Sequence, residues 1–245
     1  MVNKALGQHW LYNRTILNEI AELTGGGEVC LEIGPGLGTL TASLFKKFDK
    51  VLAVEFDEDL AKKLPGSFPG KNLEVVNADI LKYDLSGMPS GYKVAGNIPY
   101  YITSPIIEKV LKAENRPAKV VLLMQKEVAE RIADKKETML SLMVKNYANI
   151  ELGPVVKKDE FTPPPKVDSQ VLVLTPHAPK VPEKVFTLIR LAFVSPRKKL
   201  IHNLTPLKSK EFLQEVFKKR GISLDARPAD LHLEDYQVIF NDLMV

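Results

Sequence analysis

The chain has 245 residues, a net charge of +4, 45% hydrophobic residues and 26% charged residues, which is the composition of an ordinary globular protein. No apolar run approaches the roughly 20 residues that span a bilayer, and the amino terminus lacks the apolar core of a signal peptide. A single cysteine, Cys30, excludes an intrachain disulfide and a cysteine-based zinc cluster. The sequence therefore predicts a cytoplasmic protein without a metal or a membrane partner.

The first half of the chain alternates strand patterns with helix patterns. Short apolar runs predict four strands, at 29–33, 51–54, 73–77 and 94–97. Helix-spaced apolar residues predict helices at 16–23, 40–45 and 60–64, and glycines or prolines follow the first and the last of these. This alternation is typical of parallel strands joined by helices.

The second half first continues this pattern and then changes it. A helix is expected at 106–111, a fifth strand at 120–124, and an antiparallel pair at 155–156 and 171–174. The sequence thus predicts an α/β fold with a mostly parallel, doubly wound sheet of seven strands and right-handed crossovers. Between the last two strands, three prolines at 163–165 predict a stiff, extended loop.

A proline-rich stretch at 176–182 marks the predicted domain boundary, because only helical spacing follows it. We expect one domain at 1–178 and a small all-helical domain at 179–245. From Lys184 to Arg220 there are ten Lys or Arg residues against two acids, a local excess of eight positive charges. Such a surface favours a phosphate-backbone partner, although a solvated helical face explains the charge equally well.

Three successive predicted strands end in residues that suit a cofactor carrying adenosine. Gly34, Gly36 and Gly38 form a GxGxG turn where the chain can approach a ligand closely. Glu55 closes the next strand, where an acid can bind both hydroxyls of a ribose, and Asp79 follows the third, where it can accept from an adenine amino group. NAD and S-adenosylmethionine both carry adenosine, but the GxGxG spacing differs from the GxGxxG of NAD-binding folds.

The fourth strand ends in Asn97-Ile98-Pro99-Tyr100. An amide oxygen and a neighbouring carbonyl can both accept from an amino group, and a tyrosine ring can stack on a nucleobase. An ordinary strand-end turn uses the same residue types. Beside the predicted cofactor site, however, the motif presents an amine as a nucleophile, which favours a methyl donor over NAD.

Four motifs in the same order resemble the ribosomal RNA adenine dimethyltransferases, with the closest match to the bacterial branch that modifies 16S rRNA. They are Gly7-Gln-His-Trp-Leu, Glu32-Ile-Gly-Pro-Gly-Leu-Gly, Asn97-Ile-Pro-Tyr-Tyr-Ile-Thr-Ser-Pro and Phe161-Thr-Pro-Pro-Pro-Lys-Val-Asp-Ser. The resemblance implies a Rossmann-like class I methyltransferase fold and S-adenosylmethionine as cofactor. The cofactor-binding residues that it implies, with the second glycine of the turn, are His9, Leu11, Gly34, Gly36, Glu55, Asp79 and Asn97.

The resemblance further implies dimethylation of N6 on two adjacent adenosines in the 3′-terminal hairpin of 16S rRNA, in an immature 30S subunit. Asn97 and the Ile98 carbonyl would aim N6 at the methyl group, Pro99 would set the turn, and Tyr100 would stack on the base. Phe161 is the candidate for the opposite face of the base. Arg197, Lys198 and Lys199 are expected to contact RNA phosphates, and the enzyme is expected to be a monomer.

Other aromatic residues near these motifs are expected to have structural roles. Trp10 should pack against the amino-terminal helix, and Tyr101 should point into the core if the segment is extended. His9 stands where relatives often have Asn, and the loop at 134–141 is shorter than is usual in the family.

Two alternative functions share these motifs. One is a 23S rRNA adenine N6-methyltransferase of the macrolide-resistance type, whose core chemistry is identical. The other is a non-catalytic RNA- or DNA-binding assembly or transcription factor on the same fold, and the presence of Glu55, Asp79 and Asn97 argues against it.

Overall fold

Seven strands form one sheet in the computed structural model, which describes residues 8–244. In spatial order they are β4 (Leu73–Asn77), β3 (Phe48–Glu55), β2 (Gly27–Ile33), β5 (Lys93–Asn97), β6 (Lys119–Gln125), β9 (Ser169–Pro176) and β7 (Ala148–Val156). The strands from β4 to β6 are parallel, and β9 runs antiparallel to both β6 and β7. The predicted mostly parallel sheet with a terminal antiparallel pair is therefore confirmed.

The strand order reverses between β2 and β5. From β2 the chain moves outward through β3 to β4, and it then returns to add β5 and β6 on the other side. Open α/β sheets bind ligands beyond the carboxyl ends of the strands at such a point. Gly96 allows the two strands to lie close there, because a Cβ at this position would lie 2.8 Å from the Ile33 carbonyl oxygen.

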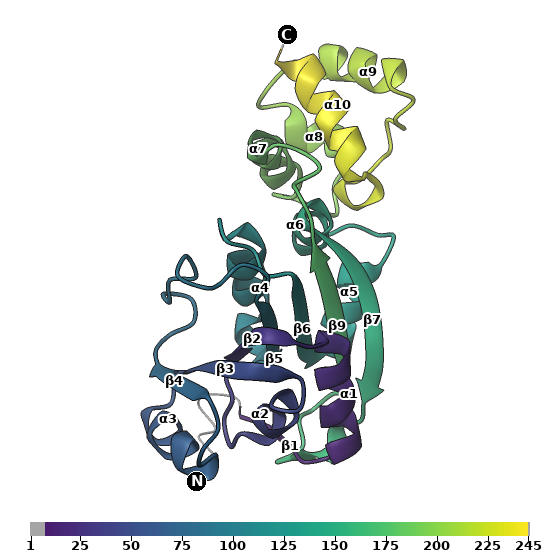
Figure 1. Cartoon of the computed structure of the whole chain (residues 1–245). Coiled ribbons are helices and arrows are strands. Elements are labelled where there is room, and N and C mark those ends of the chain that lie inside the picture. Colours follow the sequence, from purple (N-terminus) through teal and green to yellow (C-terminus); the bar gives the residue numbers. More distant parts are fainter. Residues whose placement is uncertain (1–7, 245) are drawn as a thin grey trace. The chain divides into compact units, whose positions relative to one another are not determined.

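Helices cover both faces of this sheet (Figure 1), with α1 and α2 on one face and α4 on the other. Their bounds are α1 (Arg14–Thr24), α2 (Thr39–Leu44), α3 (Glu58–Lys63) and α4 (Thr103–Lys112). The Asn13 side chain caps α1 by accepting from the nitrogens of Thr15 and Ile16, and Gly25 ends the helix with a φ of 82°. Leu17 and Ile20 of α1 are buried in the core.

A second, two-stranded sheet ties the amino-terminal segment to the proline-rich loop. In it β1 (Trp10–Leu11) pairs antiparallel with β8 (Phe161–Thr162), and Leu11 lies opposite Phe161. Both of these side chains are buried in the main hydrophobic core. This pairing joins two segments about 150 residues apart in the chain, next to the carboxyl ends of the parallel strands.

The chain forms two compact units. The sheet belongs to the first, which comprises the chain up to Glu130 and residues 148–176, and the second comprises residues 131–147 and the chain from His177. α5 (Lys126–Ala133) crosses from the first to the second. The helices of the second unit are α6 (Met139–Tyr147), α7 (Glu183–Ala192), α8 (Leu200–Leu204), α9 (Lys210–Lys219) and α10 (Leu233–Leu243). That the chain divides in function between a domain at 1–178 and a domain at 179–245 stays a prediction.

Buried Glu137 is one of the residues that connect 131–147 with the carboxy-terminal helices. Its Oε1 accepts from Lys145 Nζ at 2.8 Å and lies 2.9 Å from His232 Nδ1, while its main-chain nitrogen donates to the Ala229 carbonyl. A buried carboxylate with these partners links the two segments in one polar cluster. Sequence patterns gave no signal for this contact. Within residues 8–244, no helix is both long enough and apolar enough to cross a membrane.

Gly7, the first residue of the amino-terminal motif, lies outside the described residues. Site residues predicted from the sequence, in contrast, all fall within them.

Candidate active site

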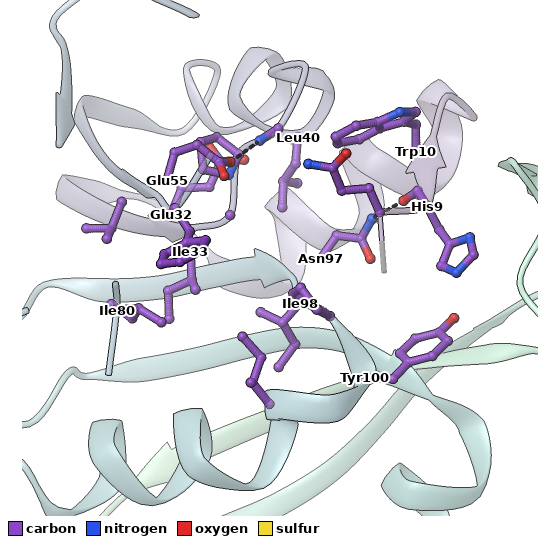
Figure 2. Close-up of a pocket in the computed structure, with 18 of the residues that line it drawn as sticks. His9, Trp10, Glu32, Ile33, Leu40, Glu55, Ile80, Asn97, Ile98 and Tyr100 are labelled. Atoms are coloured by element: carbon purple, nitrogen blue, oxygen red, sulfur yellow. Dashed lines mark hydrogen bonds between the residues drawn. The ribbon is translucent and has the colours of Figure 1, made fainter. Parts of the chain in front are cut away.

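The carboxyl ends of the parallel strands line a cavity of about 250 Å³ (Figure 2). Gly34 and Gly36 follow β2, Glu55 ends β3, Asp79 follows β4 and Asn97 ends β5. The sequence-predicted residues from four strands therefore meet in one place.

The glycine-rich turn is fixed by Glu55 (Figure 2). Gly36 has a φ of 57°, in the left-handed region, and its nitrogen donates to Glu55 Oε2 at 3.0 Å. Glu55 Oε1 accepts from the Asp57 nitrogen at 2.8 Å. Burial raises the pKa of Glu55, and these two hydrogen bonds oppose that rise. Each carboxylate oxygen still has a lone pair available for a hydroxyl group.

Glu32 lies under the same turn and was not predicted as a site residue. Its side chain is 1% exposed, and burial raises its pKa to about 8. Thr41 Oγ1 donates to Oε2 at 2.6 Å, whereas Oε1 has no hydrogen-bond partner among the described residues. Burial thus favours the neutral form of a carboxyl group at the wall of the cavity, with its Oε1 covered by protein atoms.

Asp79 and two apolar side chains form the part of the cavity beyond β3 and β4. Asp79 Oδ1 accepts from the Leu81 nitrogen at 2.9 Å, which fixes the carboxylate at the start of the loop. Phe56 is 63% exposed and Ile80 is buried, and both line the cavity. Each follows a strand-end acid directly, and this is the sequence signal that could have found them.

The Asn97 amide is oriented by the amino-terminal segment. Its Nδ2 donates to the main-chain carbonyl of His9 at 3.1 Å, so Oδ1 is the atom left to accept a hydrogen bond (Figure 2). Ile98 is buried, and its nitrogen donates to the Leu123 carbonyl of β6 at 3.3 Å. Because Pro99 fixes φ ahead of a short 3₁₀ turn, η3 (Tyr100–Ile102), the backbone leaves the strand sharply here.

Tyr100 is held at both its hydroxyl and its ring. The hydroxyl lies 2.8 Å from Ser169 Oγ at the start of β9, and Ser169 is fully buried. The ring lies nearly parallel to that of His9, with a centroid distance of 6.0 Å and an interplanar angle of 25°. Sequence reasoning missed both partners, because they come from segments far away in the chain.

Trp10 packs over the glycine turn. A Cβ at Gly36 would collide with the Trp10 ring, and Trp10 lines the cavity. The Trp10 ring thus lies against the glycine turn at the cavity, a contact that the sequence analysis did not predict, and its expected packing against the first helix stays a prediction. Leu11 lines the cavity from β1 but is 1% exposed.

Two aromatic residues lie elsewhere than expected. Phe161 is 3% exposed, packs in the core and does not line the cavity, so the structure does not bring it to the predicted base. Its place is set by pairing with Leu11. Tyr101 is 64% exposed at the cavity, because the 3₁₀ turn replaces the extended segment on which the expectation of core packing depended.

The basic run belongs to the second unit and lies outside the cavity. Arg197, Lys198 and Lys199 are all exposed just before α8. Lys199 Nζ lies 2.5 Å from Asp225 Oδ1, which lowers the pKa of that carboxyl group. No group of three or more potential metal ligands occurs within the described part of the chain.

Comparisons with known proteins agree on one family. The family model described as ribosomal RNA adenine dimethylase matches residues 1–244. Ribosomal RNA small subunit methyltransferase A of Mycoplasma mycoides subsp. mycoides is 34% identical, over 97% of this chain and 96% of its own length.

Two solved structures extend this likeness to the fold. A dimethyladenosine transferase from Plasmodium falciparum superposes with a TM-score of 0.79 at 26% identity, covering 97% of this chain and 99% of its own. The 23S rRNA methyltransferase ErmE gives a TM-score of 0.78 at 27% identity, covering 96% of this chain and all of its own. The likeness therefore includes both the sheet and the helical part. On the match of the family model and the full-length relative, the chain belongs to the ribosomal RNA adenine dimethylase family, a family of methyltransferase enzymes.

Proposed function

We propose that this enzyme uses S-adenosylmethionine to dimethylate N6 of two adjacent adenosines in the 3′-terminal hairpin of 16S rRNA, within an immature 30S subunit. One observation carries the proposal: the glycine turn and two acids that suit adenosine share a cavity with Asn97 and Tyr100, which suit an aromatic amine. Relatives named as small subunit methyltransferases support the choice of rRNA.

The cavity fits the proposed cofactor. Glu55 is held in place by two main-chain N–H groups and keeps lone pairs for the ribose hydroxyls. Asp79 lines the cavity and has a carboxylate that can accept from the adenine amino group, and Phe56 and Ile80 offer apolar surface to the adenine ring. Glu32 adds a buried carboxyl group to the lining of the same cavity. The other proposed cofactor contacts are His9, Leu11, Gly34, Gly36 and Asn97.

Asn97 and Ile98 direct the nucleophile in this proposal. When bound, S-adenosylmethionine supplies a methyl group on a positively charged sulfur. Adenine N6 is a weak nucleophile because its lone pair is delocalised into the ring. Hydrogen bonds from N6 to Asn97 Oδ1 and to the Ile98 carbonyl favour a more tetrahedral nitrogen and turn its lone pair toward the methyl group. Because Asn97 Nδ2 is already bonded to His9, the amide presents the oxygen that this role needs.

Two transfers to one nitrogen place different demands on these acceptors. Before the first transfer N6 has two hydrogens, which both acceptors can bind. The first transfer forms the N–CH3 bond and releases one N6 proton to water, so that N6 has a single hydrogen before the second. One acceptor then orients this hydrogen, and the first methyl group occupies the other position. Pro99 keeps the turn rigid through both transfers, and the stacking of Tyr100 on the base does not depend on the hydrogens of N6.

Arg197, Lys198 and Lys199 suit contact with RNA phosphates, since all three are exposed. A base enters such a cavity only after leaving its stack, so the target adenosines should lie in a loop or another unpaired segment.

Methyl transfer to unmodified 30S and 50S subunits, followed by mapping of the methylated adenines by primer extension, tests the proposal. We expect dimethylation of two adjacent adenines near the 3′ end of 16S rRNA. Modification of 23S rRNA would instead favour a 23S rRNA methyltransferase like ErmE. The structure of ErmE is as similar to this chain as that of the dimethyladenosine transferase. If both particles stay unmethylated in the presence of S-adenosylmethionine, the proposed activity is wrong.

A further inference from the structure

Tyr101 is an exposed aromatic side chain at the edge of the cavity. Its exposed fraction is 64%, and it lines the cavity together with Tyr100, the residue before it. Among the described residues, Phe56 is the other large apolar side chain that both lines the cavity and is exposed. Phe56 directly follows Glu55 and is proposed to contact the cofactor. Tyr101 is therefore the exposed aromatic surface next to the residues that are proposed to receive the base.

The Tyr100 ring has one face left for a base. Its other face is stacked on the His9 ring, with a centroid distance of 6.0 Å and an interplanar angle of 25°. One ring face can stack on one base, so in the proposed function Tyr100 serves the target adenine alone. A second base of the same RNA strand needs another aromatic surface.

The 3₁₀ turn η3 directs the two tyrosines to different places. A 3₁₀ helix has three residues per turn, so the side chains of neighbouring residues point about 120° apart. The hydroxyl group of Tyr100 is held by Ser169, whereas the side chain of Tyr101 is exposed to solvent. The turn thus presents two aromatic rings at consecutive positions, one held within the cavity and one at its mouth.

An adenine that enters the cavity leaves its neighbour in the strand without a stacking partner. The two nucleotides are joined by one phosphodiester group, so the neighbouring base must lie close to the mouth of the cavity. Proteins commonly stack such splayed bases on aromatic side chains, and because every base has a flat face this contact does not require a particular sequence.

We propose that Tyr101 stacks on the base of the nucleotide adjacent to the target adenosine, while the target adenine lies in the cavity against Tyr100. This inference rests on the proposed function and names a substrate contact within it. The strand enters the site in one polarity, so for one of the two target adenosines the base on Tyr101 is the other adenosine of the pair. Stacking there offsets part of the cost of taking the target out of its stack.

Substitutions of Tyr101 test this contact by binding, without turnover. The Kd for unmodified 30S subunits is measured on filters with S-adenosylhomocysteine, which has no methyl group to transfer. This Kd should rise about tenfold in Tyr101→Ala, because the adjacent base loses its aromatic partner, and Tyr101→Trp should stay within about twofold. Tyr12→Ala is the matched control and should also stay within about twofold, because Tyr12 is 50% exposed but does not line the cavity. Calorimetry should give a Kd for S-adenosylmethionine within about twofold of the unsubstituted enzyme for all three variants, and thermal melts check the fold.

Abasic RNA shows whether the effect comes from the adjacent base. In two reconstituted 30S subunits, one or the other of the two adjacent adenosines is replaced by an abasic residue. The remaining adenosine is then the target and lacks its neighbouring base on the 5′ side in one subunit and on the 3′ side in the other. On the subunit that lacks the stacked base, Tyr101→Ala should raise the Kd by less than about twofold, because the two changes remove the same contact.

Three results would overturn the inference. They are a cost of about tenfold for Tyr101→Ala on both abasic subunits, an unchanged Kd for this variant on the intact RNA, and a tenfold rise in its Kd for S-adenosylmethionine. Failure of the proposed function looks different, because the unsubstituted enzyme would then leave unmodified 30S subunits unmethylated. Methylation of these subunits without coupling between Tyr101 and an adjacent base contradicts the inference alone.

Discussion

The two halves of the cavity are built in different ways. The cofactor half consists of Gly34, Glu55 and Asp79, each from a successive strand-to-loop junction, and its polar groups are held mainly by nearby main-chain nitrogens. In the base half, Asn97 and Tyr100 are positioned by His9 and Ser169, which are 88 and 69 residues away in the chain. Changes in one half should therefore affect a different measured quantity from changes in the other.

The largest effect is expected for Asn97→Ala. Loss of the acceptor that aims N6 should lower kcat by about 10²- to 10³-fold, the usual cost of removing one hydrogen bond that stabilises a transition state. Single-turnover transfer of labelled methyl groups to 30S subunits measures this. Asn97→Asp serves as a matched variant, because it keeps an oxygen but loses the donor to His9, and it should also be strongly impaired. A turnover close to normal in Asn97→Ala would falsify the role of this amide.

Glu55→Ala should disturb the cofactor half. The Gly36 and Asp57 nitrogens lose the carboxylate that accepts from both of them. The ribose hydroxyls of the cofactor lose a charged acceptor. Because hydrogen bonds to charged groups contribute about 1.5–3 kcal/mol, the Kd for S-adenosylmethionine should rise roughly 10- to 100-fold. Binding of RNA on filters, measured without cofactor, should stay within about twofold. If RNA binding falls as far as cofactor binding, the two halves are not separable.

Charge reversal of Arg197, Lys198 and Lys199 should weaken RNA binding about tenfold and leave cofactor affinity unchanged. Each lost phosphate contact should lower the slope of log Kd against log salt by about 0.7–0.9. Lys62→Glu with Lys63→Glu on α3 is the control, because it removes charge from an exposed helix outside the cavity. An unchanged salt slope in the triple variant contradicts phosphate contact by this run.

Ser169→Ala should have a smaller effect, confined to the base half. The Tyr100 hydroxyl loses its partner, and a neutral hydrogen bond contributes about 1 kcal/mol, so the KM for RNA should rise about threefold to fivefold. Tyr100→Phe removes the same bond from the other side. Combining both substitutions should therefore add little to either one. Fully additive effects would show that Ser169 does not act through Tyr100.

Glu32→Gln should change stability as a function of pH. Burial raises the pKa of Glu32 from 4.5 to about 8, so its favourable contribution is complete below about pH 4.5 and is lost as the pH rises through about 8. A glutamine has no such dependence. Between about pH 5 and pH 8 the free energy of unfolding of the unsubstituted chain should fall relative to that of the variant, and the difference should level off above pH 8. Denaturant titrations across this range measure it, and parallel curves would contradict the raised pKa.

The same contrast explains what the sequence could predict. Gly34, Glu55, Asp79 and Asn97 end strands with clear apolar patterns, and parallel strands bring their carboxyl ends to one edge, so their meeting in one cavity was expected. The seven-stranded sheet followed from the same patterns.

Contacts between distant segments were not predictable. No local pattern indicates that Trp10 packs over Gly36, or that β1 pairs with β8 and keeps Phe161 in the core. The prediction that Tyr101 packs in the core was wrong because it assumed an extended segment. Residues 100–102 instead form a 3₁₀ turn, in which the side chain of Tyr101 points in a different direction. The grouping of residues 131–147 with the carboxy-terminal helices likewise involves tertiary contacts, such as that of Glu137 with His232, which no local pattern indicates.

The separation of the two halves is tested most directly by titrating S-adenosylmethionine into the Asn97→Ala variant in a calorimeter. Asn97 belongs to the base half, where its main role in this account is to aim N6, and it is also a proposed cofactor contact. The Kd should therefore rise by less than about tenfold, far less than the loss of about 10²- to 10³-fold expected for methyl transfer. A Kd that rises by the same factor as transfer falls would contradict the account, because Asn97 would then act by holding the cofactor.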